Sequence, residues 1–286
     1  MANILALKKV ARHTLPLVIL LTAGLSVLAQ TAAKPQASPA QTNDARARVT
    51  ETLVDSSLDD DPAVAKMVAV YAPKVRELDV VLGRLRGELR KGGVGSGSLG
   101  NFVTDGMRWQ ATLKTGTTIT LAVMNGGGLR RSTIGEGELR ARDVFELLPF
   151  ENALVTVDLT GVQLKKLLDT VLIGNEAQSG ARIVYKTTAE KKNETESIKL
   201  REVAGETEID PARIYTVVTI DYIYNVGGAR WGVFREGTNM KALGITLRES
   251  LMNYVKSETA AGRDIKANLD GRFTLDKANS APEVKP

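Results

Sequence analysis

The sequence predicts an α/β protein in which helices pack on a mixed β-sheet. Runs of β-branched residues, such as 117–124 (TTITLAVM), alternate along the chain with segments whose leucines recur at helical spacing, such as 161–172. Interleaved strands and helices are typical of the α/β class and of α+β folds with a mixed sheet. Hydrophobic residues make up 43% of the chain and cysteine is absent, so the core must supply stability without disulfides.

Residues 1–29 are predicted to be a secretory signal peptide. The basic residues Lys8, Lys9 and Arg12 precede an apolar run, and small residues favour cleavage after Ala29. The apolar run is too short for a comfortable membrane span, and no cysteine is available for lipid attachment. We therefore expect an exported protein, periplasmic or secreted, with no membrane span after cleavage of the signal.

The rest of the chain is predicted to hold one domain. Residues 30–60 are rich in Pro, Ala, Ser, Gln and Asn around 34–44 and lack apolar periodicity there, which is typical of a linker. The domain itself is expected to span residues 61–276, a length that suits a single domain of somewhat above average size. Residues 277–286 resemble the linker in composition and are expected to be a disordered tail.

Charge and residue types exclude several kinds of function. Without the signal peptide the chain carries 35 basic and 33 acidic residues. The resulting net charge of +2 is too small to indicate nucleic acid binding. The only histidine is His13, so histidine or cysteine zinc sites and histidine-activated nucleophiles are excluded from the mature chain. A magnesium or calcium site built of carboxylates alone stays open, although Asp59–Asp61 is better explained as favourable charge at a helix N-terminus.

The expected elements follow in chain order. Asp61 and Pro62 are typical of the N-cap and first position of a helix, which apolar spacing extends to Leu78, with Pro73 as the place for a bend. Next come a strand at 80–85, a Gly-rich loop at 92–97, a helix at 99–110 capped by Ser98, and the strand at 117–124. A short helix at 141–147, a strand at 153–159, the helix at 161–172, strands at 181–186, 197–203 and 215–220, and a long helix at 246–261 complete the prediction.

Residues 95–100 (GSGSLG) match the glycine pattern G-x-G-x-x-G of dinucleotide-binding sites. The acid that would bind the ribose is missing, because the next strand ends at Met124 and Asn125. The loop before the helix is also too long and flexible for the tight turn that such a site needs. We therefore interpret these glycines as loop flexibility beside a helix capped by Ser98.

Two short segments at strand ends are candidates for ligand binding. Asn125–Arg130 (NGGGLR) follows a strand, so its glycines leave backbone N–H groups open to a ligand, while Asn-Gly is equally typical of a hairpin turn. Leu148–Asn152 (LPFEN) lies between a helix and a strand, where Pro149 ends the helix and leaves Phe150 on a loop. A loop-borne aromatic ring could stack on a planar base or pack into the core.

Together these segments resemble the C-terminal domain of the 5'-nucleotidase family, which comprises bacterial periplasmic enzymes that hydrolyse nucleotides and UDP-sugars and their animal ecto-enzyme relatives. The resemblance depends on the order and spacing of motifs over nearly all of the chain after Asp61. The motifs are 98–105 (SLGNFVTD), 125–130 (NGGGLR), 148–152 (LPFEN), 159–161 (LTG), 227–228 (GG) and 270–273 (DGRF).

This resemblance implies a domain that binds the nucleoside part of a nucleotide. It implies that Arg130 holds the ribose or phosphate end of the ligand, and that Phe150 forms one wall of a clamp around the base. The glycine pair is implied to form the turn below the other wall. The predicted substrate-binding residues are Asn125, Gly127, Gly128, Arg130, Phe150, Asn152, Gly227 and Gly228, and no catalytic or metal-binding residue is predicted.

The sequence departs from the family pattern in three places. The family usually follows Gly-Gly with an aspartate that holds the ribose hydroxyls, then glycine and an aromatic residue, whereas this chain has Ala229-Arg230-Trp231. The second clamp aromatic falls on Ile223, between Tyr222 and Tyr224. A further family arginine falls within 92–97, where no arginine occurs. We therefore expect weak affinity for ordinary nucleotides.

In the family, a separate N-terminal metallophosphatase domain holds two metal ions that activate the attacking water. About 60 residues precede the matched region, which is too few for such a domain. We therefore expect no cofactor in this chain and no phosphate ester hydrolysis by this chain alone. A separately encoded metallophosphatase chain is the expected catalytic partner.

Three hypotheses of function follow from the sequence. The first is an exported nucleoside- or nucleotide-binding domain that acts with a metallophosphatase chain in nucleotide catabolism. The second is a non-catalytic binding or scaffold module whose nucleotide pocket has decayed. The third, a stand-alone hydrolase that uses carboxylates and magnesium, has no acidic constellation to support it.

Overall fold

The computed structural model describes residues 50–281 except 52 and 56, and the described residues from Asp59 on belong to one compact unit. The predicted signal peptide, most of the predicted linker and the end of the predicted tail lie outside the described residues. No helix in the described part of the chain combines the length and the apolar character needed to cross a membrane.

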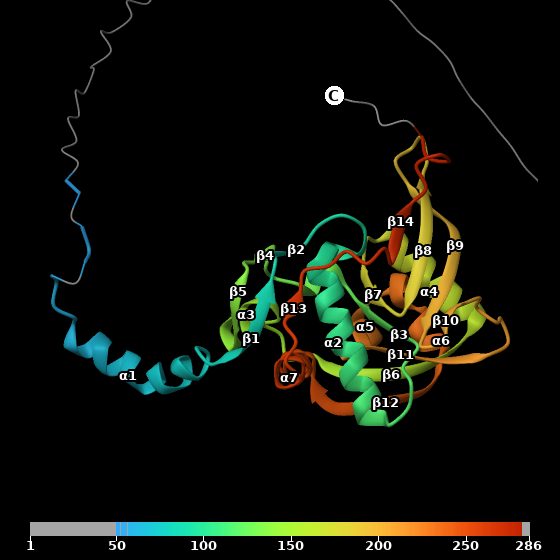
Figure 1. Ribbon diagram of the computed structural model, residues 1–286. Helices are drawn as coiled ribbons and strands as arrows, with labels where there is room; N and C mark the ends of the chain where they lie inside the picture. The colour runs from blue at the N-terminus through green and yellow to red at the C-terminus, as the bar shows by residue number, and fades with distance from the viewer. Residues whose placement is uncertain (1–49, 52, 56, 282–286) are drawn as a thin grey trace, which may run out of the picture. The chain divides into compact units, whose positions relative to one another are not determined.

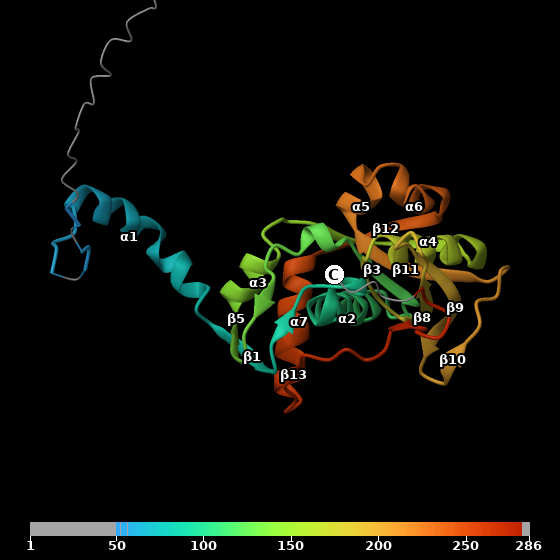
Figure 2. The same cartoon turned by 90° about the horizontal axis from the view of Figure 1, so that it is seen from above.

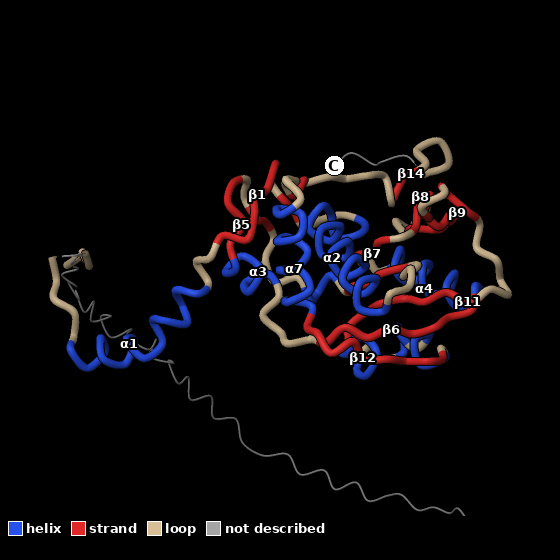
Figure 3. Tube along the Cα trace, turned by 60° about the horizontal axis from the view of Figure 1, so that its bottom comes forward, coloured by secondary structure: helices blue, strands red, loops and turns tan. Residues whose placement is uncertain are grey.

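A mixed five-stranded sheet forms the centre of the fold, in the order β12-β6-β11-β3-β7 (Figure 3). β3 and β11 are parallel, and the other neighbours are antiparallel. All four residues of β3 are buried, because helices cover both faces of the sheet at this strand. The strands are β3 (Leu121–Met124), β6 (Ala153–Thr160), β7 (Ala177–Ser179), β11 (Ile214–Ile220) and β12 (Thr238–Thr246).

Helices cover the two faces of this sheet. Figure 2 shows α2 and α7 on one side and α4, α5 and α6 on the other. Their apolar side chains make one continuous core with the strands, in which Tyr215 and Phe234 are the largest fully buried side chains. The helices are α2 (Gly97–Thr115), α3 (Ala141–Leu147), α4 (Gly161–Ile173), α5 (Asp221–Val226), α6 (Val233–Glu236) and α7 (Leu247–Ala260).

Three smaller sheets surround the central one (Figure 1). One has the order β10-β9-β8-β14, the second has the order β13-β1-β5, and the third pairs β2 with β4. The C-terminal segment therefore adds an edge strand to two of these sheets, because β13 pairs with β1 and β14 pairs with β8. The strands are β1 (Val81–Arg86), β2 (Leu89–Arg90), β4 (Thr133–Ile134), β5 (Gly137–Arg140), β8 (Ala181–Thr187), β9 (Asn193–Glu202), β10 (Gly205–Thr207), β13 (Ile265–Lys266) and β14 (Phe273–Leu275).

The first helix, α1 (Pro62–Glu77), begins as predicted from its cap. The Asp61 carboxylate accepts hydrogen bonds from the backbone N–H groups of Ala63 and Val64, which satisfies two donors of the first turn. The helix continues through Pro73 rather than ending there, and none of its residues is buried. Its large apolar side chains, among them Met67 and Tyr71, are more than half exposed.

The mixed α/β class predicted from the sequence is confirmed, and one predicted detail is wrong. The N-cap of α2 is Ser96 in a left-handed conformation, and Ser98 lies inside the helix. The Ser98 hydroxyl accepts a hydrogen bond from the backbone N–H of Arg90, so it fixes β2 to the helix instead of capping it. A β-carbon at Gly97 or Gly100 would overlap a backbone carbonyl, so close packing explains these glycines of the G-x-G-x-x-G pattern.

Candidate functional site

The segment Asn125–Arg130 leaves the buried end of β3 as a tight 3₁₀ turn (Gly126–Gly128). The N–H groups of Gly128 and Leu129 donate to the carbonyls of Asn125 and Gly126 at 3.0 and 3.1 Å. The chain then runs to β4, which pairs with β2 and not with β3. The segment is therefore not the hairpin turn that Asn-Gly also allowed.

The three glycines of this turn have different surroundings. A β-carbon at Gly126 would lie 2.6 Å from the Ser96 hydroxyl, and one at Gly128 would lie 2.3 Å from the Met124 methyl carbon. Gly127 is exposed, and a β-carbon there would meet only the amide nitrogen of Asn125, at 3.4 Å. The outer two glycines are thus required by packing, while the middle one leaves backbone open to solvent.

Arg130 and Phe150 lie together at the surface. The guanidinium carbon of Arg130 is 5.9 Å from the centroid of the Phe150 ring, a distance that suits a cation–π contact. Arg130 is exposed and Phe150 is 51% exposed, so neither belongs to the core. Their proximity has a backbone cause, because the N–H of Arg130 donates to the carbonyl of Leu147 at the end of α3.

The loop that carries Phe150 is held by the last long helix. Arg248 of α7 donates from its guanidinium to the carbonyls of Leu148 and Pro149 at 3.0 and 2.8 Å. The carbonyl of Asn152 accepts the N–H of Leu247, which joins the end of the loop to the first turn of the same helix. An exposed aromatic ring on a loop with these fixed carbonyls is a preorganised surface for stacking.

Gly227 and Gly228 follow α5 and begin a second 3₁₀ turn (Ala229–Trp231). A β-carbon at Gly227 would lie 2.5 Å from the carbonyl of Ile223 and 2.6 Å from the Trp231 ring, and Gly228 has a φ of 68°. Ile223, at the position of the second clamp aromatic, is only 1% exposed. This position therefore contributes to the core and offers no wall to a ligand.

Glu176, which the sequence analysis did not single out, connects the two glycine turns. One of its carboxylate oxygens accepts the N–H of Gly126, and the other forms an ion pair with Arg230 at 2.9 Å. The carboxylate side chain is 8% exposed. Its only sequence signal is an acidic residue between Asn175 and the buried strand β7, which is too weak to find without the structure.

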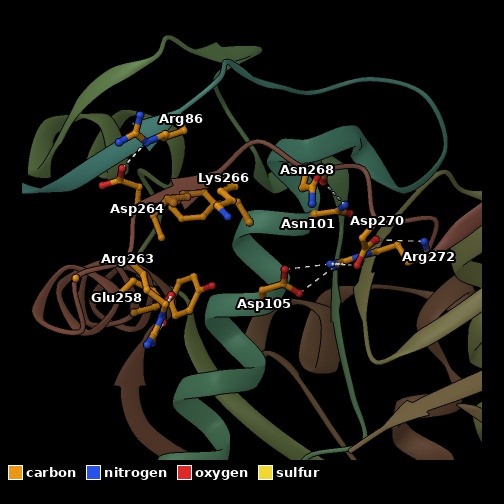
Figure 4. A pocket seen from close by; sticks show the side chains of 14 residues that line it. Arg86, Asn101, Asp105, Glu258, Arg263, Asp264, Lys266, Asn268, Asp270 and Arg272 are labelled. Carbon is orange, nitrogen blue, oxygen red and sulfur yellow. Dashed lines mark hydrogen bonds and ion pairs between the residues drawn. The ribbon is translucent and has the colours of Figure 1, made fainter. Parts of the chain in front are cut away.

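A cavity of about 560 Å³ lies away from these residues, between α2, α7 and the segment 262–272 (Figure 4). None of the predicted site residues lines it. Its charged groups are mostly paired with one another, and Arg272 is the most buried of them at 7% exposure. The Arg272 guanidinium donates to the carboxylates of Asp105 and Asp270 and to the carbonyl of Gln178, all at 2.9 to 3.0 Å.

This pairing changes the titration of the groups involved. Burial by itself would raise the pKa of Asp270, but the hydrogen bonds and charge of Arg272, with the charge of Arg201, outweigh it and lower that pKa below its ordinary value. Burial, aided by the charges of Asp105 and Glu258, raises the pKa of Tyr254 in the same cavity to about 12. The Asp270 carboxylate therefore stays ionised at neutral pH and holds Arg272 in place.

In the described residues, no group of three or more histidine, cysteine, aspartate or glutamate side chains is arranged to hold a metal ion. The Asn125–Arg130 turn offers hydrogen bonds and positive charge, and the Phe150 ring beside it offers a stacking surface. Those are means of binding a ligand.

Comparison with known proteins agrees with this geometry. The sequence model described as "5'-nucleotidase, C-terminal domain" matches residues 74–236, which is more than half of the chain. The chain belongs to this family. Its predicted membership is thereby confirmed, and the match includes both glycine turns and the Phe150 loop.

Two curated relatives place the domain within longer proteins. The chain is 30% identical over 184 residues to the trifunctional nucleotide phosphoesterase protein YfkN of Bacillus subtilis, which covers 62% of this chain and 12% of that protein. It is 28% identical over 185 residues to the cell wall protein Lmo0130 of Listeria monocytogenes, covering 61% of this chain and 23% of that protein. The chain therefore spans less than a quarter of the length of these relatives.

A solved relative has the same fold. The 5'-nucleotidase precursor from Thermus thermophilus superimposes with a TM-score of 0.62 at 27% sequence identity. The superposition covers 74% of this chain and 43% of the Thermus protein. The family domain is thus present here as a mixed α/β fold of the 5'-nucleotidase C-terminal type.

Proposed function

We propose that this domain binds the nucleoside part of a nucleotide at the Asn125–Arg130 turn and the Phe150 loop. The observation that carries the proposal is the exposed pair of Arg130 and Phe150, whose guanidinium carbon and ring centroid are 5.9 Å apart. Hydrogen bonds from Arg248 hold the Phe150 loop in place. The ring offers a stacking face for the base, and the guanidinium offers charged donors to a phosphate or ribose oxygen. Asn125 supports the same function, because its buried side-chain oxygen has no hydrogen-bond partner within the protein.

Calorimetric titration tests this binding function. AMP, UMP and UDP-glucose are titrated into the purified domain, and into Phe150→Ala and Arg130→Ala. Binding of at least one of the three, weakened by both substitutions, is the expected result. Unchanged binding in both variants would place the ligand elsewhere on the molecule.

We propose further that the domain is exported and contributes substrate binding to phosphoester hydrolysis whose metal ions lie on another polypeptide. The predicted signal peptide supports export, and one relative is a cell wall protein. The region shared with this chain is 12% of the nucleotide phosphoesterase YfkN and 43% of the Thermus 5'-nucleotidase precursor. Mixing the domain with a metallophosphatase chain should raise the nucleotidase rate or lower its Michaelis constant, and no change in either would contradict the partnership.

A second candidate is a binding or scaffold module that has lost nucleotide affinity. It is favoured by one observation, the burial of Ile223 at the position of the second clamp aromatic. Micromolar binding of any of the three nucleotides, abolished by Phe150→Ala, would contradict this candidate. Absence of binding in the wild-type domain would support it.

A further inference from the structure

Arg230 lies in the turn Ala229–Trp231 that follows the glycine pair, and its side chain is held in place from several sides. Its ion pair with Glu176 is 2.9 Å long, and its guanidinium carbon lies 5.4 Å from the centroid of the Trp231 ring. A β-carbon at Gly174 would overlap the guanidinium, so glycine at the end of α4 leaves the space that this side chain fills. The Arg230 side chain nevertheless remains 44% exposed, which leaves part of the guanidinium accessible to a ligand.

Two cations bond directly to the Asn125–Arg130 turn, and a third, Arg230, is linked to it through Glu176. Arg230 reaches the N–H of Gly126 through Glu176, and the Arg130 guanidinium donates to the carbonyl of Gly127 at 3.4 Å. The Lys91 ammonium donates to the carbonyl of Leu129 at 2.9 Å. Glu176 is the one carboxylate among these contacts, and its side chain is 8% exposed, whereas Arg130 and Lys91 are exposed.

The loop 92–97 lies against the same turn, through Ser96. A β-carbon at Gly126 would lie 2.6 Å from the Ser96 hydroxyl and 3.4 Å from the Glu176 carboxylate. The Ser96 hydroxyl also donates to the carbonyl of Asn175, the residue before Glu176. Arg230 is therefore linked through Glu176 to Gly126, which packs against Ser96 of this loop.

We propose that Arg230 is a second anion-binding group of this site, positioned by Glu176, and that the site selects phosphorylated nucleotides over nucleosides. This proposal rests on the proposed nucleotide-binding function and names its ligand class. A guanidinium fixed on one edge by a carboxylate loses little freedom when its other donors bind a phosphate oxygen. Because Arg130 lies on the Asn125–Arg130 turn and Lys91 donates to its Leu129 carbonyl, the preference should grow from nucleoside to monophosphate to diphosphate.

The test is a calorimetric titration of adenosine, AMP and ADP into the wild-type protein, Arg230→Gln and Glu176→Gln. The wild-type protein is expected to bind ADP and AMP more tightly than adenosine. Arg230→Gln should weaken AMP and ADP binding about 10- to 100-fold, the usual loss for a charge-assisted hydrogen bond, with adenosine changed much less. Glu176→Gln should reduce the preference for AMP over adenosine by a smaller factor, because glutamine can still accept one hydrogen bond from Arg230.

A matched control is Arg213→Gln. Arg213 also pairs with a carboxylate, Glu202 at 3.6 Å, and lies 5.1 Å from an aromatic ring, that of Tyr215. It precedes β11, whereas the candidate site follows the parallel strand β3, so the two arginines lie toward opposite ends of the sheet. This control should leave all three affinities unchanged, and thermal melting of each variant checks that the fold is intact.

The possible results separate this proposal from the proposed function. If Arg230→Gln binds AMP and ADP as the wild type does while Arg130→Ala weakens them, nucleotide binding stands and the role of Arg230 is overturned. A stronger or unchanged preference for AMP in Glu176→Gln would show that Glu176 competes with phosphate or is indifferent to it, which overturns its positioning role. If the wild-type protein binds none of the three ligands, both proposals fail.

Discussion

Two arginines of this domain have opposite environments. Arg272 is 7% exposed, and two carboxylates and a carbonyl accept hydrogen bonds from its guanidinium at 2.9 to 3.0 Å. Arg130 is exposed, with one long hydrogen bond to a carbonyl at 3.4 Å and an aromatic ring beside it. The first has its donors satisfied by the protein, and the second can still satisfy a ligand.

This difference indicates which charged groups stabilise the fold and which bind a ligand. A buried guanidinium with several close acceptors joins α2, β7 and the C-terminal segment, so its removal should affect folding. An exposed guanidinium contributes little to stability but keeps donors for an anion. The cavity of about 560 Å³ belongs to the first kind of region, although its size alone would suggest a binding site.

Among the charged residues, the largest expected effect is on stability, from Arg272→Ala. Removing the guanidinium leaves Asp105 without this ion-pair partner and Asp270 with Arg201 alone, which should lower the free energy of unfolding by about 3 kcal/mol. Urea denaturation measures the change. Arg263→Ala, which removes an exposed partner of Glu258, serves as the control and should cost much less stability. Equal losses of unfolding free energy in the two variants would contradict the distinction between a buried, fully hydrogen-bonded arginine and an exposed one.

The next effect is on binding, from Arg130→Ala. Loss of a charge-assisted hydrogen bond to the ligand should weaken nucleotide binding by about 1.5–3 kcal/mol while the urea midpoint stays nearly unchanged. Calorimetry and denaturation on the same preparation measure both quantities. A large loss of stability with intact affinity would place Arg130 in the same structural class as Arg272.

Phe150→Ala sharpens the comparison for aromatic residues. Loss of a stacking face should weaken nucleotide binding by about 1–3 kcal/mol, with little change in stability because the ring is 51% exposed. Phe234→Ala is the matched core variant, since Phe234 is fully buried, and it should cost about 3–5 kcal/mol of stability. If Phe150→Ala destabilises the fold as much as Phe234→Ala does, the Phe150 loop is a packing element.

The smallest effect concerns pH. The pKa of Asp270 is lower in the folded protein than in the unfolded chain, so its contribution to stability is present above the unfolded value of about 3.9. That contribution is lost as the pH falls through the lower folded value, and its size is modest because the side chain is a third exposed. Urea midpoints between pH 7 and pH 3 should fall more steeply in the wild type than in Asp270→Asn. Parallel curves would show that the carboxylate does not contribute.

The sequence predicted the long elements because apolar periodicity and capping residues are local signals. α3 (Ala141–Leu147) was predicted with its observed bounds, and the Asp61 cap of α1 is formed as expected. The short strands of the C-terminal segment were not predicted, because β13 and β14 exist only through pairing with β1 and β8. Their apolar patterns are too short to be recognised alone.

The candidate site shows the same limit. Arg130 and Phe150 could be singled out from motifs, since each lies directly after a predicted strand or helix. Glu176 could not, because its importance comes from two contacts, with Gly126 and Arg230, which lie 50 and 54 positions away in the chain. The role of Ser98 was wrong for a related reason, since its hydroxyl bonds to β2 rather than to its own helix.

The most direct test of the central claim is amide hydrogen exchange with and without saturating AMP, because it locates the ligand without a substitution. The account predicts slower exchange in the segments 125–130 and 148–152 and no change in 262–272. Protection confined to 262–272, around the Arg272 cavity, would contradict the assignment of ligand binding to the Arg130 and Phe150 region.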